Sequence, residues 1–250
     1  SMIYSLWVSD ISDCAGNTIQ DSIEIRFAIP EFPDSNDIIV NEILFYPYDG
    51  GEDFVEVYNR SQKVIDLKSL RVANFDTIGV PPINQKEIAP EGFLLFPGEY
   101  LVLTVSPQAV KSQYSTLNEN GFIQMESMPS FNLDEGSVVL NDTLGNIIDV
   151  FIYNEDMHVP LLNSFKGVSL ERIAFDRSSV DRTNWHSAAE TVGFATPAYQ
   201  NSQFDVPQIA DNPITVEPAI FSPDNDGYND VLNFNYVFDT PGFIASITIF

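Results

Sequence analysis

The segment that decides the fold is Asp53-Phe-Val-Glu-Val-Tyr-Asn-Arg-Ser-Gln-Lys-Val-Ile-Asp-Leu-Lys-Ser-Leu-Arg-Val72. Its first part, residues 54–58, is rich in β-branched and aromatic residues, which favours a strand. The polar cluster at 59–62 is typical of a turn, and Val64-Ile-Asp-Leu67 opens a second extended run. Neither strand carries a nucleophile, a metal ligand set or a phosphate loop. The segment therefore predicts a β-sandwich scaffold whose function lies on its loops or in its neighbours.

The same pattern continues along the chain. Turn sequences such as Tyr48-Asp-Gly-Gly51 and Asp142-Thr-Leu-Gly145 separate short apolar runs, and helical periodicity is almost absent. Many short strands at this spacing predict an all-β fold, an antiparallel sandwich or barrel. The expected strands are Ile3–Ser9, Ser22–Ala28, Asp37–Phe45, Asp53–Asn59, Leu67–Asn74, Tyr100–Val105, Ser137–Asn141, Ile147–Tyr153 and Ser169–Ile173.

The composition excludes several classes of function. There are 36 acidic and 11 basic residues, a formal charge of −25, which would repel nucleic acid and anionic membranes. The acidic residues are scattered, which favours a solvated surface over a dedicated acidic site. Cys14 is the single cysteine, so the fold must rest on its core without an intrachain disulfide. The sequence shows no apolar run long enough to span a bilayer and no signal peptide pattern. We therefore expect neither nucleic acid binding nor membrane insertion.

Two proline-marked stretches predict domain boundaries. They are Pro30-Glu-Phe-Pro-Asp-Ser-Asn36 and Phe204-Asp-Val-Pro-Gln-Ile-Ala-Asp-Asn-Pro213, and such runs suit connectors. The predicted units are a middle domain at 35–203 and partial units at 1–31 and 213–250. The sequence stops within an alternating run, Ser246–Phe250, so we expect a fragment of a longer protein. The strands of the flanking units should pair with the middle domain, with each other or with a second molecule.

Seven motifs follow one another along the middle unit: Ile39–Ile43, Asp53–Asn59, Asp66–Val72, Phe96–Leu103, Val139–Val150, Gly167–Ile173, and the closing Asn184-Trp185 with Thr196–Ser202. In these motifs and their order the middle unit resembles a lamin tail domain of the type found in secreted bacterial proteins. Where that family tends to carry Gly-Trp and Gly, this chain has Ser69-Leu70 and Ala198. Leu70 can still fill a core position, whereas Ala198 implies a closing turn that avoids positive φ or is strained. The resemblance implies an immunoglobulin-like β-sandwich without activity of its own.

The two ends resemble other bacterial modules. Tyr4–Asn17 is similar to the tail of an immunoglobulin-like repeat, and Val216–Val231 to the opening of another such domain, of the flagellar hook-capping type. The latter also resembles the start of C-terminal modules of gliding bacteria. These resemblances imply an extracellular or cell-surface setting, associated with the outer membrane.

The best candidate for a metal site is the loop Asp224-Asn-Asp-Gly-Tyr-Asn-Asp230. Oxygen ligands at alternate positions around a glycine suit a hard cation such as calcium, with carboxylates from Asp224, Asp226 and Asp230. The loop lacks the length and bidentate glutamate of an EF-hand. An Asx-rich turn, whose side chains bond their own backbone, is the alternative. Calcium is the single cofactor that the sequence suggests.

A long excursion, Ser106–Leu133, is a candidate for partner binding. It begins with a predicted short helix at 107–114, because proline suits the first turn of a helix. Met125, Met128 and Phe131 follow, and methionines adapt to partner surfaces. The favoured interpretation is that these residues cap one end of the sandwich.

The side chains capable of catalysis have structural interpretations that we favour. His158 and His186 show no metal spacing, and Asn184-Trp185-His186 reads as a core tryptophan with a polar neighbour. Glu42 and Glu56 are predicted to face each other across adjacent strands, on a solvated outer face. Glu171-Arg172 is interpreted as a structural ion pair or an edge charge. A carbohydrate platform could be built from Tyr46, Tyr48 and Tyr114, although most aromatic residues in a sandwich belong to the core.

The sequence thus predicts a non-catalytic structural or interaction module that spaces or docks adjoining domains of an exported or surface-anchored bacterial protein. Its expected partners are the adjoining domains of the same polypeptide. The alternative is an accessory module of a secreted hydrolase that binds a surface protein or a glycan. An enzyme fragment is a third hypothesis, and it requires one of the two histidines to contact a serine or aspartate in a cleft.

Overall fold

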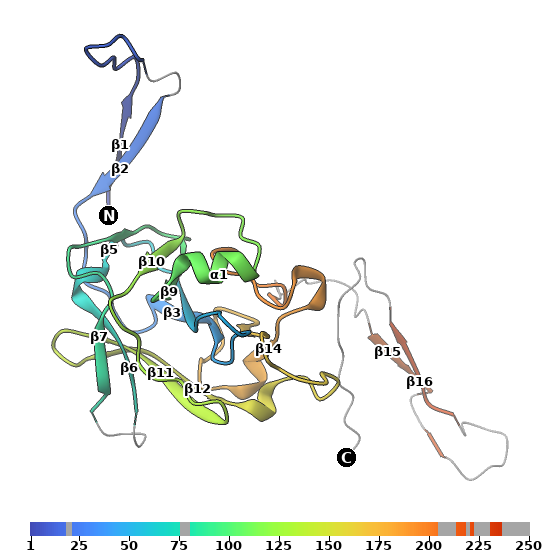
Figure 1. The fold of residues 1–250 in the computed structure, drawn as a ribbon. Helices are drawn as coiled ribbons and strands as arrows, with labels where there is room; N and C mark the ends of the chain where they lie inside the picture. The colour runs from blue at the N-terminus through green and yellow to red at the C-terminus, as the bar shows by residue number, and fades with distance from the viewer. Residues whose placement is uncertain (19–21, 76–80, 205–213, 219–220, 223–230, 237–250) are drawn as a thin grey trace.

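The computed structural model describes residues 1–18, 22–75, 81–204, 214–218, 221–222 and 231–236. Its middle part consists of two β-sheets packed face to face (Figure 1). The six-stranded sheet has the order β10-β9-β4-β3-β13-β14, and the four-stranded sheet has the order β12-β11-β6-β7. All pairings in these sheets are antiparallel except that of β10 with β9. This confirms the all-β immunoglobulin-like sandwich.

The elements have the following bounds. The six-stranded sheet contains β3 (Ile38–Leu44), β4 (Phe54–Asn59), β9 (Tyr100–Thr104), β10 (Phe122–Gln124), β13 (Leu170–Arg172) and β14 (Trp185–Ser187). The four-stranded sheet contains β6 (Leu70–Asn74), β7 (Ile83–Glu87), β11 (Glu135–Asp142) and β12 (Ile147–Asn154). Short additions are β5 (Ile65–Asp66) paired with β8 (Leu94–Leu95), α1 (Pro107–Gln113), and the 3-10 turns Leu67–Ser69, Glu155–Met157, Arg182–Asn184 and Glu190–Val192.

The main core fills the space between the two sheets. Val55 and Val57 alternate inward from β4, and Val138 and Leu140 do so from β11, because successive side chains of a strand point to opposite faces. Trp185 stacks on Phe151 with ring centroids 3.5 Å apart, and both are buried. Trp185 is thus the core residue that the sequence predicts. The same core includes Leu70, Met125 and Phe131, so the end of the excursion caps the sandwich, as expected.

A second, smaller core covers the outer face of the six-stranded sheet. Leu44, Phe54 and Val102 pack there against Val110 of α1 and against Ala195 and Ala198 near the end of the domain. Helix α1 begins at Pro107, and the side chain of Ser106 caps it by accepting from the N–H of Ala109. Because both faces of β3 are covered, every residue of that strand is buried.

The turn at Ala198 is strained. Its φ is +69°, in the left-handed region that residues with a Cβ adopt at an energetic disadvantage. Of the two outcomes that the alanine implied, the structure therefore shows the strained turn.

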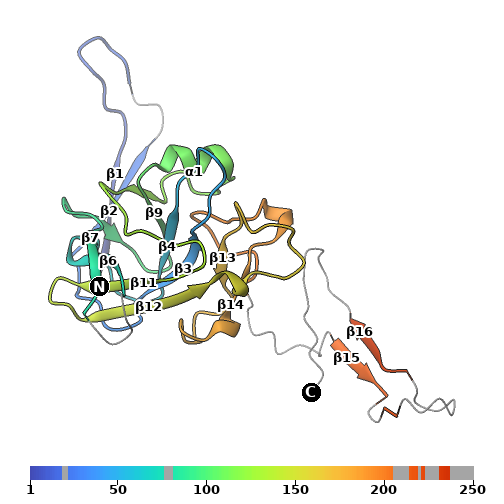
Figure 2. The same cartoon turned by 60° about the horizontal axis from the view of Figure 1, so that its bottom comes forward.

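The flanking strands pair as hairpins. In the N-terminal part, β1 (Ile3–Val8) pairs with β2 (Ile23–Ala28), and this hairpin stands out from the sandwich (Figures 1 and 2). In the C-terminal part, β15 (Ile214–Glu217) pairs with β16 (Asn233–Tyr236). The expectation that these strands pair with one another is confirmed for both hairpins. Among the described residues, no helix has the length and apolar character to cross a membrane.

Candidate functional site

Three glutamates form a row across the centre of the six-stranded sheet. Strand register places Glu56 of β4 opposite Glu42 of β3, and Glu42 opposite Glu171 of β13. Residues directly opposite each other share one face of a sheet, so the three side chains lie next to one another. All three are fully buried. We call these residues the carboxyl row.

The row is covered by a segment near the end of the domain, Ala195–Gln203, which we call the closing segment. The N–H of Thr196 donates to Oε1 of Glu42 (2.9 Å), and the N–H of Ala198 donates to Oε2 of Glu56. Oε2 of Glu171 accepts from the hydroxyl of Ser202 (2.7 Å) and from the N–H of Gln203 (2.9 Å). Each glutamate therefore holds a different part of the closing segment.

Side chains of the sheet complete the hydrogen bonding of the row. Ser169 donates its hydroxyl to Oε1 of Glu42 (2.5 Å), and the amide of Asn41 donates to Oε1 of Glu56 (2.7 Å). The same amide also donates to Oδ1 of Asn201 in the closing segment (2.7 Å). Among the described residues, the hydrogen-bond donors to the row are thus neutral groups, and none is a cation.

Burial without a positive partner changes the titration of the row. It raises the pKa of Glu42 to about 8, and the neighbouring Glu171 carboxyl adds to the rise. Burial also raises the pKa of Glu56 well above its usual range, with a second contribution from Glu42. The pKa of Glu171 is raised for the same first reason, although its hydrogen bonds oppose the rise.

The sequence prediction for Glu42 and Glu56 was half right. They do face each other, but the face is not solvated, because the closing segment covers it. Within the described ranges no group of three His, Cys, Asp or Glu side chains could hold a metal ion. The row is consequently suited to binding protons and backbone donors. No local signal in the sequence connects β3 to a segment that lies more than 150 residues away.

Glu171 and Arg172 diverge to opposite faces of β13. While Glu171 joins the carboxyl row, Arg172 points into the sandwich and pairs with Asp149 of β12. Both residues are buried, so the interpretation as an edge charge is wrong. A buried structural ion pair is present, and its acid is Asp149.

His158 contacts a serine, as the enzyme hypothesis requires, but the arrangement is structural. Its Nδ1 lies 2.9 Å from the hydroxyl oxygen of Ser187, which also accepts from the N–H of Val159. Both side chains are buried, and the imidazole stacks on Phe165. Burial lowers the pKa of His158 to about 4. A buried serine that already serves a backbone N–H is poorly placed to attack a substrate.

The other histidine, His186, has a different environment. Its Nδ1 lies 2.9 Å from the carbonyl oxygen of Ser187, and strand register places it opposite Glu171. It thus extends the carboxyl row at the edge strand β14.

The tyrosines expected for a carbohydrate platform do not form one. Tyr114 is buried and donates its hydroxyl to the carbonyl of Gly167 (3.0 Å). Tyr48 stacks against it with ring centroids 6.2 Å apart and is 40% exposed, while Tyr46 is half-buried against the main core. Little flat aromatic surface is left for a sugar.

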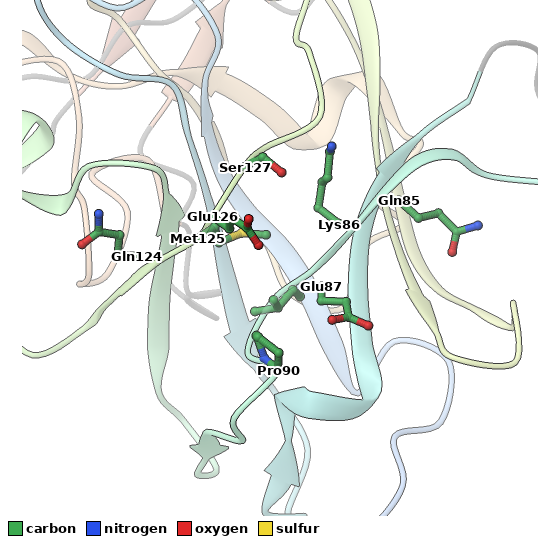
Figure 3. A pocket seen from close by; sticks show the side chains of 9 residues that line it. Gln85, Lys86, Glu87, Pro90, Gln124, Met125, Glu126 and Ser127 are labelled. Atoms are coloured by element: carbon green, nitrogen blue, oxygen red, sulfur yellow. The ribbon is translucent and has the colours of Figure 1, made fainter.

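An open cleft lies at one side of the sandwich, between β7 and the chain that follows β10 (Figure 3). Its volume is about 510 Å³. Strands β7 and β10 are each at the edge of their sheet. Each therefore presents one row of backbone N–H and C=O groups away from the strand with which it pairs. Lys86 and Met125 are among the lining residues, together with the exposed Glu87 and Glu126. Within the described chain, this cleft is a candidate for binding an extended peptide.

Comparison with known proteins finds a family match for the central segment. Residues 32–155 match the family model of the Lamin Tail Domain. No curated protein matched this chain. Four chains of solved structures match, one being the crystal structure of a DUF4876 family protein from Bacteroides thetaiotaomicron. It is 16% identical over 68% of this chain and 69% of that chain, with a TM-score of 0.35.

The lamin tail match covers only part of the carboxyl row and its surroundings. Glu42 and Glu56 lie within the lamin tail segment, whereas Glu171 and the closing segment lie beyond residue 155. The cleft between β7 and β10 lies inside it. The candidate calcium ligands Asp224, Asp226 and Asp230 fall outside the residues that the structure describes.

Proposed function

We propose that this chain is a non-catalytic module of a larger exported or cell-surface bacterial protein, in which it spaces or docks adjoining domains. The observation that carries this proposal is the N-terminal hairpin. It exposes large apolar side chains on both of its faces, since consecutive residues of its strands are exposed: Ile3, Tyr4, Leu6, Trp7, Ile23, Ile25 and Phe27. An exposed apolar surface of this kind marks an interaction site.

The base of the hairpin is fixed to the sandwich. Arg26 forms an ion pair with Glu99, and its guanidinium lies 4.2 Å from the ring centroid of Phe96. Farther along, the N–H of Glu31 donates to the carbonyl of Val64 (2.8 Å). Because a two-stranded hairpin is marginally stable by itself, these anchors support a hairpin that an adjoining domain completes.

Two further observations support a non-catalytic role. The buried carboxyls of the row are hydrogen-bonded to the closing segment, and His158 is packed between aromatic rings. An extracellular or cell-surface setting rests on the resemblance of the chain to modules of exported bacterial proteins.

The fluorescence of Trp7 tests the docking proposal, because the chain has two tryptophans. A Trp185→Phe variant would leave Trp7 as the reporter, both in this chain and in the longer protein that contains it. We expect acrylamide to quench Trp7 several-fold less in the longer protein. The matched control, Trp7→Phe, reports the buried Trp185 and should be quenched equally in both. Equal quenching of Trp7 in the two contexts would refute docking through this hairpin.

The cleft between β7 and β10 favours a second function, binding of an extended peptide from a surface protein. Gly121 and Met125 hydrogen-bond toward β9, so the backbone of Gln124 points to the free edge. A peptide could add there as a new strand. Arrays of peptides and glycans would test this: we expect peptide binding that Gln124→Pro removes and that Gln124→Ala, which retains the backbone N–H, keeps. Signals confined to glycans would contradict it.

For the loop Asp224–Asp230 we propose calcium as the cation that its carboxylates would take. Calorimetric titration of the chain with CaCl₂ should release or absorb heat that an Asp226→Ala variant lacks. Identical flat traces would leave the Asx-rich turn as the explanation of this sequence.

A further inference from the structure

We propose that the carboxyl row holds at least one proton at neutral pH, and that this proton makes the closing segment a pH-sensitive latch. In the closed state Glu42, Glu56 and Glu171 bind the segment while at least one of them is a neutral acid. As pH rises and the row loses its proton, repulsion between adjacent carboxylates should loosen the segment. This inference is independent of the docking role.

The proton count follows from one hydroxyl. Oγ1 of Thr196 lies 2.6 Å from Oε1 of Glu171 and 3.3 Å from Oε2 of Glu42. A threonine hydroxyl has one hydrogen, so it can donate to one of these two oxygens. The other contact is satisfied when that carboxyl carries a hydrogen and donates to Oγ1. The shorter distance assigns the hydroxyl hydrogen to Glu171, which leaves Glu42 as the acid.

The other oxygens of Glu42 and Glu56 already accept hydrogen bonds. Oε1 of Glu42 already accepts from Ser169 and from the N–H of Thr196, and both oxygens of Glu56 accept from N–H donors. The proton on Glu42 is therefore placed on Oε2, facing Thr196. The raised pKa of Glu42, about 8, agrees with this assignment.

Other titratable groups surround the row. From the sheet, Tyr100 of β9 and His186 of β14 flank it, and Nδ1 of His186 is directed at a carbonyl oxygen. From above, Tyr114 at the end of α1 and Tyr199 of the closing segment are close enough to interact with it. The guanidinium of Arg172, which follows Glu171 in the sequence, points to the opposite face of β13 and pairs with Asp149. Ionisation of Glu42 would thus place a carboxylate directly between Glu56 and Glu171.

The direction of the pH effect follows from linkage. In the closed state Glu42 keeps its proton up to pH of about 8, whereas an opened segment would let it ionise near its usual value of 4.5. Between these limits, opening releases one proton. The equilibrium constant for opening should consequently rise about tenfold per pH unit.

Amide hydrogen exchange in the intact chain tests the latch. The amides to follow are those of Thr196, Ala198 and Gln203, because they donate to the row. Their protection factors, corrected for the intrinsic exchange rate, should fall about tenfold per unit between pH 6 and pH 8. Protection factors that do not change over this range would overturn the proposal.

Two variants sharpen the test. Glu42→Gln places an amide N–H where we place the acidic hydrogen, so the segment should stay closed and the pH dependence should be lost. Glu126→Gln, which makes the same substitution at an exposed position, should keep the pH dependence of the wild type. Retention of the full pH dependence in Glu42→Gln would contradict the assignment. Thr196→Val, which removes the shared hydroxyl, should lower protection of the segment at pH 6 even if Glu42→Gln does not fold.

Discussion

Nη1 of Arg172 lies 3.6 Å from Oδ2 of Asp149, inside the sandwich, where both side chains are almost completely buried. Asp149 also accepts from the hydroxyl of Ser179 and from the N–H of Val40, and Arg172 donates to the carbonyl of Val40 (3.1 Å). Burial raises the pKa of Asp149 and lowers the pKa of Arg172, so desolvation outweighs the attraction between them. The pair joins β13 to β12 and hence one sheet to the other.

Arg172→Leu should destabilise the chain by about 3–5 kcal/mol, because it leaves the Asp149 carboxylate buried without its partner. Chemical denaturation at pH 7 measures this. The control is Arg177→Leu, which removes the more exposed pair with Asp181 and should change stability by less than about 1 kcal/mol. Equal effects of the two variants would show that the buried pair has no special role.

His158 predicts a loss of stability in acid. In the unfolded chain it binds a proton below about pH 6.5, but burial lowers its folded pKa to about 4. The contribution of neutral His158 to folding stability is therefore complete above pH 6.5. It is lost as pH falls toward 4, by about 3 kcal/mol in total.

The pH profile of unfolding for His158→Phe checks this. We expect a flatter acid limb than in the wild type, because the phenyl ring fits beside Phe45 and Phe165 and binds no proton. His186→Gln should keep most of the acid loss. If His158→Phe loses as much stability in acid as the wild type does, the acid loss must come from groups other than His158.

Gly167 should not tolerate a side chain. Its φ is +77°, and a Cβ at this position would overlap the ring of Tyr48. Gly167→Ala should lower stability by about 3 kcal/mol, from backbone strain and overpacking together. Gly145→Ala shares the positive φ but meets no atom within 4 Å, and should lose about 1 kcal/mol. Thermal unfolding measures the stability of both variants. Equal losses of stability would show that overlap with Tyr48 does not contribute to the cost of Gly167→Ala.

Much of the sandwich is predictable because local patterns agree with the fold. The expected strand Asp53–Asn59 differs from β4 by one residue, and Tyr100–Val105 differs from β9 by one residue. Alternation and turn residues are local signals, so they predict a strand even when the strand that pairs with it is unknown. By contrast, Leu67–Asn74 was expected as one strand, but its first three residues form a 3-10 turn capped by Asp66.

The parts that sequence reasoning missed depend on distant segments. Strands β7, β10 and β14 are short or polar, and they become strands by pairing with β6, β9 and β13. The carboxyl row was missed for the same reason. Polar residues at alternate positions indicate a solvated face, and they lose that meaning when a later segment covers the face and donates its N–H groups.

The measurement that bears most directly on the carboxyl row is a ¹³C NMR titration of the side-chain carboxyl carbons of Glu42, Glu56 and Glu171. If the row holds its proton in the folded chain, Glu42 should titrate with a midpoint near pH 8, and its signal should be absent in Glu42→Gln. Titration of all three carboxyls near pH 4.5, with the chain still folded, would show that the row is fully ionised at neutral pH and would contradict the latch.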